Sequence, residues 1–469
     1  LPSGVRTLTG VATSITAFVG YTRKGVPDKA VPVTSFSDFE RAYGGLDRDS
    51  PVSYGVRQFF ANGGAQAIIV RVATGHASAA WTLQDASVAA LDVTASSPGT
   101  WGNDLRITVS RASALNPDAQ FNLVVSQLQA DGVTLVPLET HRNLDMNSSS
   151  SRYVESVVNN ASALVSAKRK GGLTFNQAGF AVSSAITFPL TATDLVIAGV
   201  VNGSQAFRLT LAGPAPANMA GLVTAVNTAI GTAGLTAMLQ ASDSLADGSA
   251  GAGCLKLASL ASGESSSVVI AGGALGGLSG SIHLGLANAG REFTGNAQHR
   301  PADAANLVPP TKGTDGTRAG ANEVVGSASG KTGMYALQDV DLFNILSIPE
   351  TYDMTDLQAA AVIPAAVELC EKRRAFYIVD APSGKSLSNI ASWANGVTQS
   401  RNAAVYFPAV KLVDPLDELR PRAMAPSGTL AGVYARTDAN RGVWKAPAGT
   451  DATLNGVLDL AAPLNDLEN

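Results

Sequence analysis

Two short segments of this 469-residue chain combine glycine, lysine and a hydroxyl residue in the order used by phosphate-binding loops. Gly384-Lys385-Ser386 lies between an expected strand and an expected helix, which is the context such a loop requires. The loop also needs a glycine five residues before its second glycine. Val379 occupies that place, and Pro382 removes a backbone donor. Residues 326–332 carry a glycine pair but are one residue short, so a flexible interdomain connection explains them better.

The chain also offers few candidate residues for nucleophilic catalysis or metal binding. The chain has four histidines: His76, His141, His283 and His299. None lies in the α/β segments where a Ser-His-Asp site would be expected, and no pair has metal-ligand spacing. The two cysteines, Cys254 and Cys370, lie in different expected domains, which fits a protein assembled in a reducing cytoplasm. We therefore predict no catalytic, metal-binding or cofactor-binding residues, and no cofactor.

Asp380 is the best single candidate for a catalytic carboxylate, because it ends an expected strand of the α/β segments. A cap on the loop before Pro382 accounts for the same residue and is the interpretation that we favour. An enzyme that binds a phosphate-bearing ligand near Asp380, Lys385 and Ser386 stays as the alternative.

The length and charge of the chain limit the classes of protein to which it can belong. A chain this long is expected to form two or three domains. The net charge of -4 provides no basic field for nucleic acid, and 45% hydrophobic content argues against disorder. The longest apolar candidate for a membrane span, residues 268–290, is interrupted by glycine and serine and contains His283. We predict neither nucleic-acid binding nor membrane insertion.

The first segment predicts a β-α-α-β arrangement. Residues 13–20 and 65–72 are rich in β-branched residues and are expected strands. Ser35 is expected to cap a helix that ends before Gly44. Ser50 with Pro51 starts a second helix. Its expected buried stripe is Val52, Val56, Phe59 and Phe60.

The middle of the chain divides into two β-rich parts. In the first, residues 105–110 and 121–128 are expected strands, and a helical stretch is expected around residues 154–167. Charge then falls abruptly, since residues 171–290 contain six charged side chains: Asp194, Arg208, Asp243, Asp247, Lys256 and Glu264. Within that part we expect a strand at 206–211, a helix with Met219, Leu222, Val223, Val226 and Ile230 on one face, and a strand at 235–240.

The last segment alternates strands and helices, which predicts a largely parallel sheet. The expected strands are 342–348, 375–380 and 403–407, and the expected helices are 355–374 and 386–395. The first helix is expected to place Leu357, Ala361, Val367 and Cys370 on its apolar side. Pro364 predicts a kink or break in it.

Several segments resemble the core of contractile tail sheath proteins, the outer cylinders of phage tails and phage-like injection machines. They are residues 2–6, 13–20, 50–60, 62–64, 65–72, 98–103, 339–349, 400–408 and 426–449. The last of these, from Pro426-Ser427-Gly428 through Val433-Tyr434-Ala435-Arg436-Thr437-Asp438 to Gly449, is the most specific.

The resemblance implies an α/β multidomain fold with a discontinuous core made by both ends of the chain. We expect residues 1–75 and 295–469 to form that core, with 76–170 as a β-rich inserted domain and 171–294 as a charge-poor variable insertion. The implied function is structural, without enzyme activity. Copies stack helically around a tail tube, in a virion tail assembled in the host bacterial cytoplasm. The implied partners are the protein itself, the tube protein, and the baseplate and tail terminator proteins.

The resemblance covers the core but not complete terminal linker arms. Family members exchange strands through such arms, and this sequence begins at Leu1 and ends at Asn469 within them. We therefore expect a fragment, or the ordered part of a longer chain, that is monomeric or weakly associating alone. A surface adhesin built on residues 171–294 is a further alternative.

Overall fold

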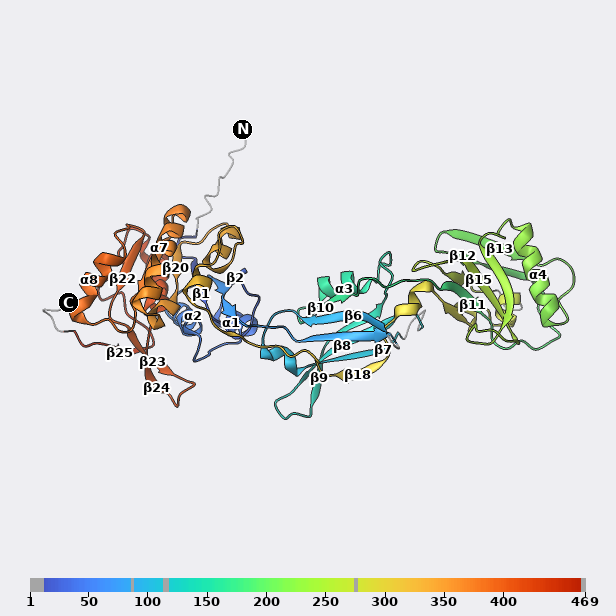
Figure 1. Cartoon of the computed structure of the whole chain (residues 1–469), viewed down its shortest axis with the longest axis horizontal. Coiled ribbons are helices and arrows are strands. Elements are labelled where there is room, and N and C mark those ends of the chain that lie inside the picture. The colour runs from blue at the N-terminus through green and yellow to red at the C-terminus, as the bar shows by residue number, and fades with distance from the viewer. Residues whose placement is uncertain (1–11, 86–87, 113–117, 274–276, 465–469) are drawn as a thin grey trace, which may run out of the picture. The chain divides into compact units, whose positions relative to one another are not determined.

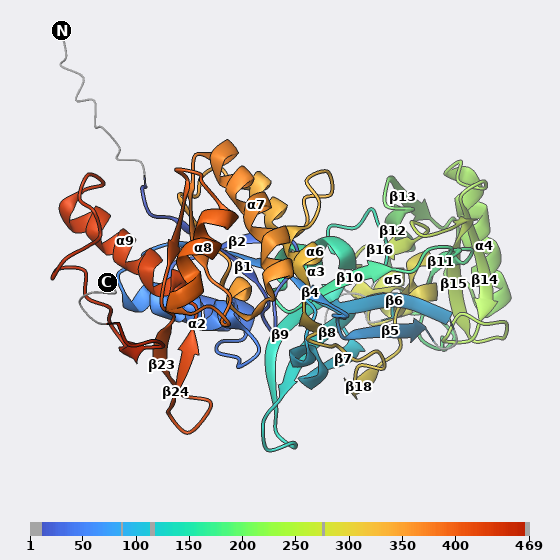
Figure 2. The same cartoon turned by 60° about the vertical axis from the view of Figure 1, so that its left-hand side comes forward.

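The computed structural model describes residues 12–85, 88–112, 118–273 and 277–464. The resemblance segment 2–6 therefore lies outside the described residues, as do residues 465–469. The chain divides into two compact units. Within the described residues, unit 1 comprises 12–79, 97–102 and 312–464, and unit 2 comprises the remainder of 80–311. Figures 1 and 2 show the elements of both units.

Unit 1 is built on a six-stranded sheet to which both ends of the chain contribute (Figure 1). Its strands, in spatial order, are β2 (Ala30–Val33), β3 (Ala67–Arg71), β1 (Thr16–Gly20), β20 (Ile345–Ser347), β21 (Phe376–Asp380) and β22 (Ala403–Tyr406). β1 pairs in parallel with both β3 and β20, and β2 alone is antiparallel. The expected parallel sheet and discontinuous α/β core are therefore present.

Both faces of this sheet are buried, as is usual for parallel sheets. Along β1, Ala17 and Val19 pack on one face, while Phe18 packs on the other. The first face is covered by α6 (Ala321–Val325), η4 (Gly333–Asp339) and α7 (Asp356–Arg373). The second is covered by α1 (Phe36–Tyr43), α2 (Pro51–Ala61) and α9 (Ser427–Arg441).

Capping residues determine where helices α1 and α2 begin. The Ser35 hydroxyl accepts a hydrogen bond from the Asp38 amide at the start of α1, and Gly44 ends it in the left-handed conformation. The Ser50 hydroxyl accepts a hydrogen bond from the Ser53 amide at the start of α2.

The remaining elements of unit 1 are β4 (Ala73–Thr74), β19 (Thr317–Arg318), η5 (Pro349–Asp353), α8 (Leu387–Val397), β23 (Val410–Asp414), β24 (Arg420–Met424) and β25 (Val457–Leu460). The short helix η1 (Thr100–Asp104) begins in unit 1 and continues into unit 2.

Unit 2 contains four antiparallel sheets. The first sheet contains, in spatial order, β10 (Val165–Arg169), β6 (Val88–Ala95) and β5 (Ala80–Asp85). The second contains β18 (Ala304–Leu307), β7 (Leu105–Arg111), β8 (Phe121–Leu128) and β9 (Leu135–Leu144). The third sheet contains β14 (Leu239–Ser244), β15 (Cys254–Ser262), β11 (Ala178–Val182) and β17 (Arg291–Phe293). The fourth contains β13 (Gln205–Thr210), β12 (Val196–Val201) and β16 (Val268–Ile270).

Helices in unit 2 are few. They are α3 (Val154–Ala161), α4 (Met219–Thr232), α5 (Leu278–Ser281), η2 (Leu286–Asn288) and η3 (Gly295–His299). Leu222, Val226 and Ile230 of α4 are buried against the charge-poor sheets, as the spacing predicts. Among the described residues, no helix combines the length and apolar character that crossing a membrane requires.

Four local predictions are wrong. The helix expected over 154–167 ends at Ala161, because the residues after it pair with β6 as β10. The strand expected at 235–240 begins only at Leu239, after a turn closed by Leu235. The strand expected at 342–348 is reduced to Ile345–Ser347. The fourth error is in α2, where Phe60 is only half-buried while the rest of the predicted stripe is buried.

Helix α7 also differs from its predicted form. Leu357 is 84% exposed and Ala361 is also exposed, so the predicted apolar side is half wrong. The buried face runs through Ala359, Val362, Ile363, Ala366, Val367, Leu369 and Cys370. The helix continues through Pro364 without a break. Pro364 and Ala360, four residues earlier, are both exposed, so the carbonyl that loses its partner lies on the solvent side.

Candidate functional site

Asp380 is fully buried at the end of β21, where it binds the start of α9. Its carboxylate accepts hydrogen bonds from the Ser427 amide (2.9 Å) and the Ser427 hydroxyl. The Ser427 hydroxyl also contacts the Ser347 hydroxyl at 2.7 Å. Burial raises the pKa of Asp380 to about 7, and the bonds from Ser427 oppose that rise. The favoured role, a cap on the loop before Pro382, is wrong, because the carboxylate caps α9 instead.

Lys385 and Ser386 do not join Asp380 in a site. The Lys385 ammonium pairs with the Asp356 carboxylate at 2.6 Å and lies 5.6 Å from the centre of the Trp393 ring. The Ser386 amide donates to the Asn389 side chain at 2.9 Å, at the start of α8. A hollow of about 110 Å³ lies beside Lys385, but Asp380 does not line it. The three residues therefore do not converge on a phosphate position.

The second glycine-lysine segment, residues 326–332, follows helix α6 rather than a strand. Its amides are used internally, since the Gly326 amide donates to the Asn322 carbonyl and the Ser327 amide to the Thr332 hydroxyl. Lys331 forms an ion pair with Asp339. These contacts leave the segment without the converging donors of a phosphate loop.

His299 and His141 each lie beside one carboxylate. Nδ1 of His299 lies 3.0 Å from an Asp85 carboxylate oxygen and Nε2 lies 3.0 Å from the Thr174 carbonyl oxygen, while His141 lies 3.3 Å from Glu139. The two cysteines are buried and unbridged. The part of the chain that the structure describes contains no group of three histidine, cysteine or carboxylate side chains placed to hold a metal ion.

A buried arginine donates hydrogen bonds to several segments of unit 1. Arg71, the last residue of β3, is completely buried, and burial lowers its pKa. Its five guanidinium hydrogens match five hydrogen bonds, all to backbone carbonyl oxygens. The acceptors are Thr22 (2.8 Å), Gly25 (2.6 Å), Pro98 (3.1 Å), Arg23 (3.4 Å) and Asp315 (2.6 Å). One side chain thus joins three segments of unit 1 that are far apart in sequence.

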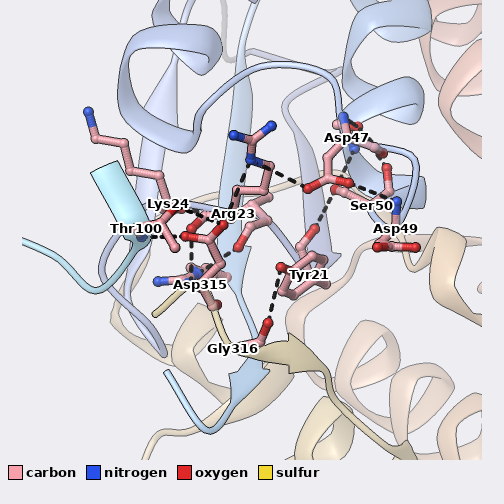
Figure 3. Close-up of polar contacts among 12 residues, drawn as sticks. Tyr21, Arg23, Lys24, Asp47, Asp49, Ser50, Thr100, Asp315 and Gly316 are labelled. Atoms are coloured by element: carbon pink, nitrogen blue, oxygen red, sulfur yellow. Dashed lines mark hydrogen bonds and ion pairs between the residues drawn. The ribbon is translucent and has the colours of Figure 1, made fainter. Parts of the chain in front are cut away.

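Side chains of the same three segments also bind to each other, as the contacts of Tyr21, Arg23 and Asp315 in Figure 3 show. The Asp315 carboxylate accepts from the Thr100 amide at 2.5 Å and the Thr100 hydroxyl at 3.2 Å. Arg23 lies 3.6 Å from Asp47 and 3.9 Å from Asp315. The Tyr21 hydroxyl donates to the Gly316 carbonyl at 3.3 Å. We call Tyr21, Arg23, Arg71, Thr100 and Asp315 the root cluster, because residues 97–102 and 312–316 adjoin the chain segments that lead into unit 2.

The buried Glu350 adds a further link between the two ends of the chain and forms an ion pair with the partly buried Arg318. Glu350 is 3% exposed and accepts from the Tyr21 amide at 2.9 Å and from Arg318 Nε at 2.9 Å. Arg318 also pairs with Asp353 at 2.7 Å. Burial raises the pKa of Glu350, and the Arg318 charge opposes that rise.

Helices α2 and α9 approach each other through glycines. A Cβ atom on Gly428 would lie 2.4 Å from the Gly55 carbonyl oxygen, and one on Gly432 would lie 2.6 Å from the Phe59 carbonyl oxygen. No real Cβ tolerates such distances, so only glycine fits at these positions. The contact brings residues 50–64 against the segment that begins at Pro426.

Sequence reasoning did not single out Arg71, Asp315 or Glu350. The one available signal was an arginine that ends the apolar run Ala67-Ile68-Ile69-Val70 of an expected buried strand. A charge in that place requires buried partners. Those partners are backbone carbonyls, which every residue has, so their positions could not be derived from residue types.

No protein-family model matches the chain, and no curated protein matches it. Among solved structures, the chain is similar to the sheath tail protein of Desulfitobacterium hafniense, with 11% identity and a TM-score of 0.41, over 100% of this chain and 68% of that one. The sheath tail protein of Listeria innocua has 12% identity and a TM-score of 0.42, over 98% of this chain and 63% of that one.

A shorter similarity is to the helical sheath of the anti-feeding prophage in its contracted state. It has 30% identity and a TM-score of 0.22, over 28% of this chain and 33% of that one. The chain thus spans about two thirds of the two sheath tail proteins and about a third of the prophage sheath chain. All three are sheath proteins, the class that the sequence resembles.

Proposed function

We propose that this chain is a structural subunit of a contractile tail sheath. Copies polymerise around a tail tube and contract to drive the tube through the envelope of a target cell. Its partners are further copies of itself, the tube protein, and the baseplate and tail terminator proteins. It acts in the tail of a virion or a phage-like particle, assembled in the bacterial cytoplasm, and carries out no enzymatic reaction.

One observation carries the proposal: several of the described segments that carry the sheath resemblance meet in one core. Residues 50–64 and 426–449 contribute α2 and α9, which touch through Gly55 and Gly428. Residues 339–349 and 400–408 contribute β20 and β22 to the sheet beneath them. Segments separated by more than three hundred residues thus build the split core that the resemblance implies.

The expected domains, 1–75 with 295–469 as core and 76–170 and 171–294 as insertions, are part of this proposal. We adjust two boundaries in it, because residues 295–311 lie in unit 2 and residues 97–102 lie in unit 1. The root cluster supports a mechanical role for the junction. Rigid-body rotation of subunits about their interfaces is one general form of large conformational change, and it requires subunit cores that keep their shape. The core is held together at the segments that lead into unit 2 by the five hydrogen bonds of Arg71 and by the ion pair between Arg318 and Glu350.

Electron microscopy tests the proposal directly. The full natural chain is produced together with the tube protein of the same tail, and particles are labelled with gold-conjugated antibody against unit 2. We expect hollow cylinders labelled along their whole length, and shorter, wider labelled cylinders after contraction. Label confined to one end of the particles, or tubes that form without this chain on them, would overturn the proposal.

A further inference from the structure

Unit 2 contains a groove of about 490 Å³, and most of the residues that line it have polar side chains. It is formed by the loop after β9 (145–150), the β12–β13 turn (202–204) and the loop after β15 (264–267), together with Gln120 and Asn296. Its volume falls within the roughly 300–1,000 Å³ of ordinary ligand sites. Its lining side chains offer hydroxyl, amide and carboxylate groups, and these lie beside apolar surface that includes Val269.

The floor of the groove is built and buried. Asp145, Ser266 and Asn296 are 9%, 4% and 3% exposed. The Asn296 amide donates to the Asp145 carboxylate, which also accepts from the Asn147 amide at 2.8 Å. The Ser266 hydroxyl accepts from the Gly179 amide at 2.8 Å. Because hydrogen bonds already hold these side chains in place, the groove needs little rearrangement to receive a ligand.

The charge of the groove disfavours an anionic ligand. Among the described residues, none of those that line it is lysine, arginine or histidine. Arg169 pairs with Glu264 of the groove at 2.6 Å, and its side chain is 22% exposed. A phosphate or an acidic sugar would therefore meet the Asp145 and Glu264 carboxylates without a compensating charge.

The rim offers groups that donate and accept hydrogen bonds. The hydroxyls of Ser149, Ser204 and Ser265 make no hydrogen bond with any residue that the structure describes. A hydroxyl both donates and accepts, as do the hydroxyls of a sugar. We propose that this groove binds a neutral oligosaccharide, an activity that is independent of the sheath function proposed above.

The test uses the fluorescently labelled full chain on an array of neutral and acidic glycans, followed by titration with the best neutral glycan. We expect binding of neutral glycans and at least a tenfold loss of affinity in Ser204→Leu, which fills the groove from an exposed turn. Ala250→Leu is the matched control, because residue 250 is exposed in the loop at the opposite end of β15. It should bind as the parent chain does.

Three results would overturn the proposal. They are no glycan bound, unchanged affinity in Ser204→Leu, and binding of acidic glycans only. If the Ser204→Leu chain misfolds, Ser265→Ala provides a milder change, with an expected loss of about threefold in affinity. None of these outcomes bears on whether the chain assembles into cylinders, so the two proposals fail separately.

Discussion

Arg71 stabilises unit 1 by satisfying backbone carbonyls rather than by pairing with a carboxylate. Five carbonyl oxygens from three segments face one guanidinium group. A buried carbonyl without a donor costs roughly 1–3 kcal/mol, so the arginine and its acceptors depend on each other. This mutual dependence makes unit 1 sensitive to the loss of Arg71.

We expect Arg71→Met to destabilise unit 1 by at least about 3 kcal/mol, because it removes every donor from this set of buried carbonyls. Urea unfolding followed by tryptophan fluorescence measures the change. Arg41→Met is the control, since Arg41 pairs with Asp38 on the surface and its side chain is 77% exposed. It should alter the free energy of unfolding by no more than about 0.5 kcal/mol. Equal effects of the two substitutions would contradict the role assigned to Arg71.

Asp380 is expected to make unit 1 less stable as the pH rises. Its pKa is about 7 in the folded chain against 3.8 for the free side chain, so the folded state holds the proton more tightly. The stability that the protonated form contributes is complete below pH 3.8 and is lost as the pH rises through about 7. Between about pH 5 and pH 8 the loss should be roughly 3 kcal/mol.

Asp380→Asn removes the titrating group but keeps an oxygen that can accept from the Ser427 amide. Chemical unfolding of the parent and variant chains at several pH values gives the comparison. The difference in free energy of unfolding between them should change across this pH range in favour of the variant. A constant difference would show that Asp380 stays charged throughout.

At the scale of elements, the contact between α2 and α9 depends on the absence of side chains at two glycines. Gly428→Ala would place a methyl group 2.4 Å from the Gly55 carbonyl oxygen, so the helices must separate. We expect a loss of about 1–3 kcal/mol in the free energy of unfolding, measured by urea titration.

Gly396→Ala on α8 is the matched control for Gly428→Ala. A Cβ at Gly396 meets nothing within 4 Å, so only the helix propensity changes. This variant should be neutral or more stable by up to about 1 kcal/mol. If both alanines had the same effect, close packing would not be the reason for glycine at position 428.

The elements that the sequence predicts well are those with local signals. β8 is found at Phe121–Leu128 as predicted, and α1 starts at Ser35 and stops at Gly44, because alternation and capping are written in neighbouring residues. The face of α7 was predicted wrongly at Leu357. That helix is rich in alanine, so its apolar residues do not mark one side, and only packing on the sheet decides which side is buried.

At the scale of the whole molecule, sequence patterns do not determine which segments meet. Arg71 and Asp315 are joined by a 2.6 Å hydrogen bond across more than two hundred residues, and nothing in either residue's neighbourhood specifies the other. The split core was nevertheless predicted, through the family resemblance of its segments. The groove of unit 2 was not predicted, since it is assembled from loops whose residues are ordinary turn formers.

Each unit has its own apolar core, so we expect two unfolding transitions in calorimetry of the full chain. Leu346 lies in the core of unit 1 and Leu257 in that of unit 2, and both are completely buried in strands. Leu346→Ala and Leu257→Ala each leave a cavity that costs about 2–5 kcal/mol, which lowers the midpoint of the affected unit by roughly 5–15 °C. Each substitution should move one transition and leave the other in place. A single transition that both substitutions lower would contradict this prediction and would show that the two units unfold cooperatively.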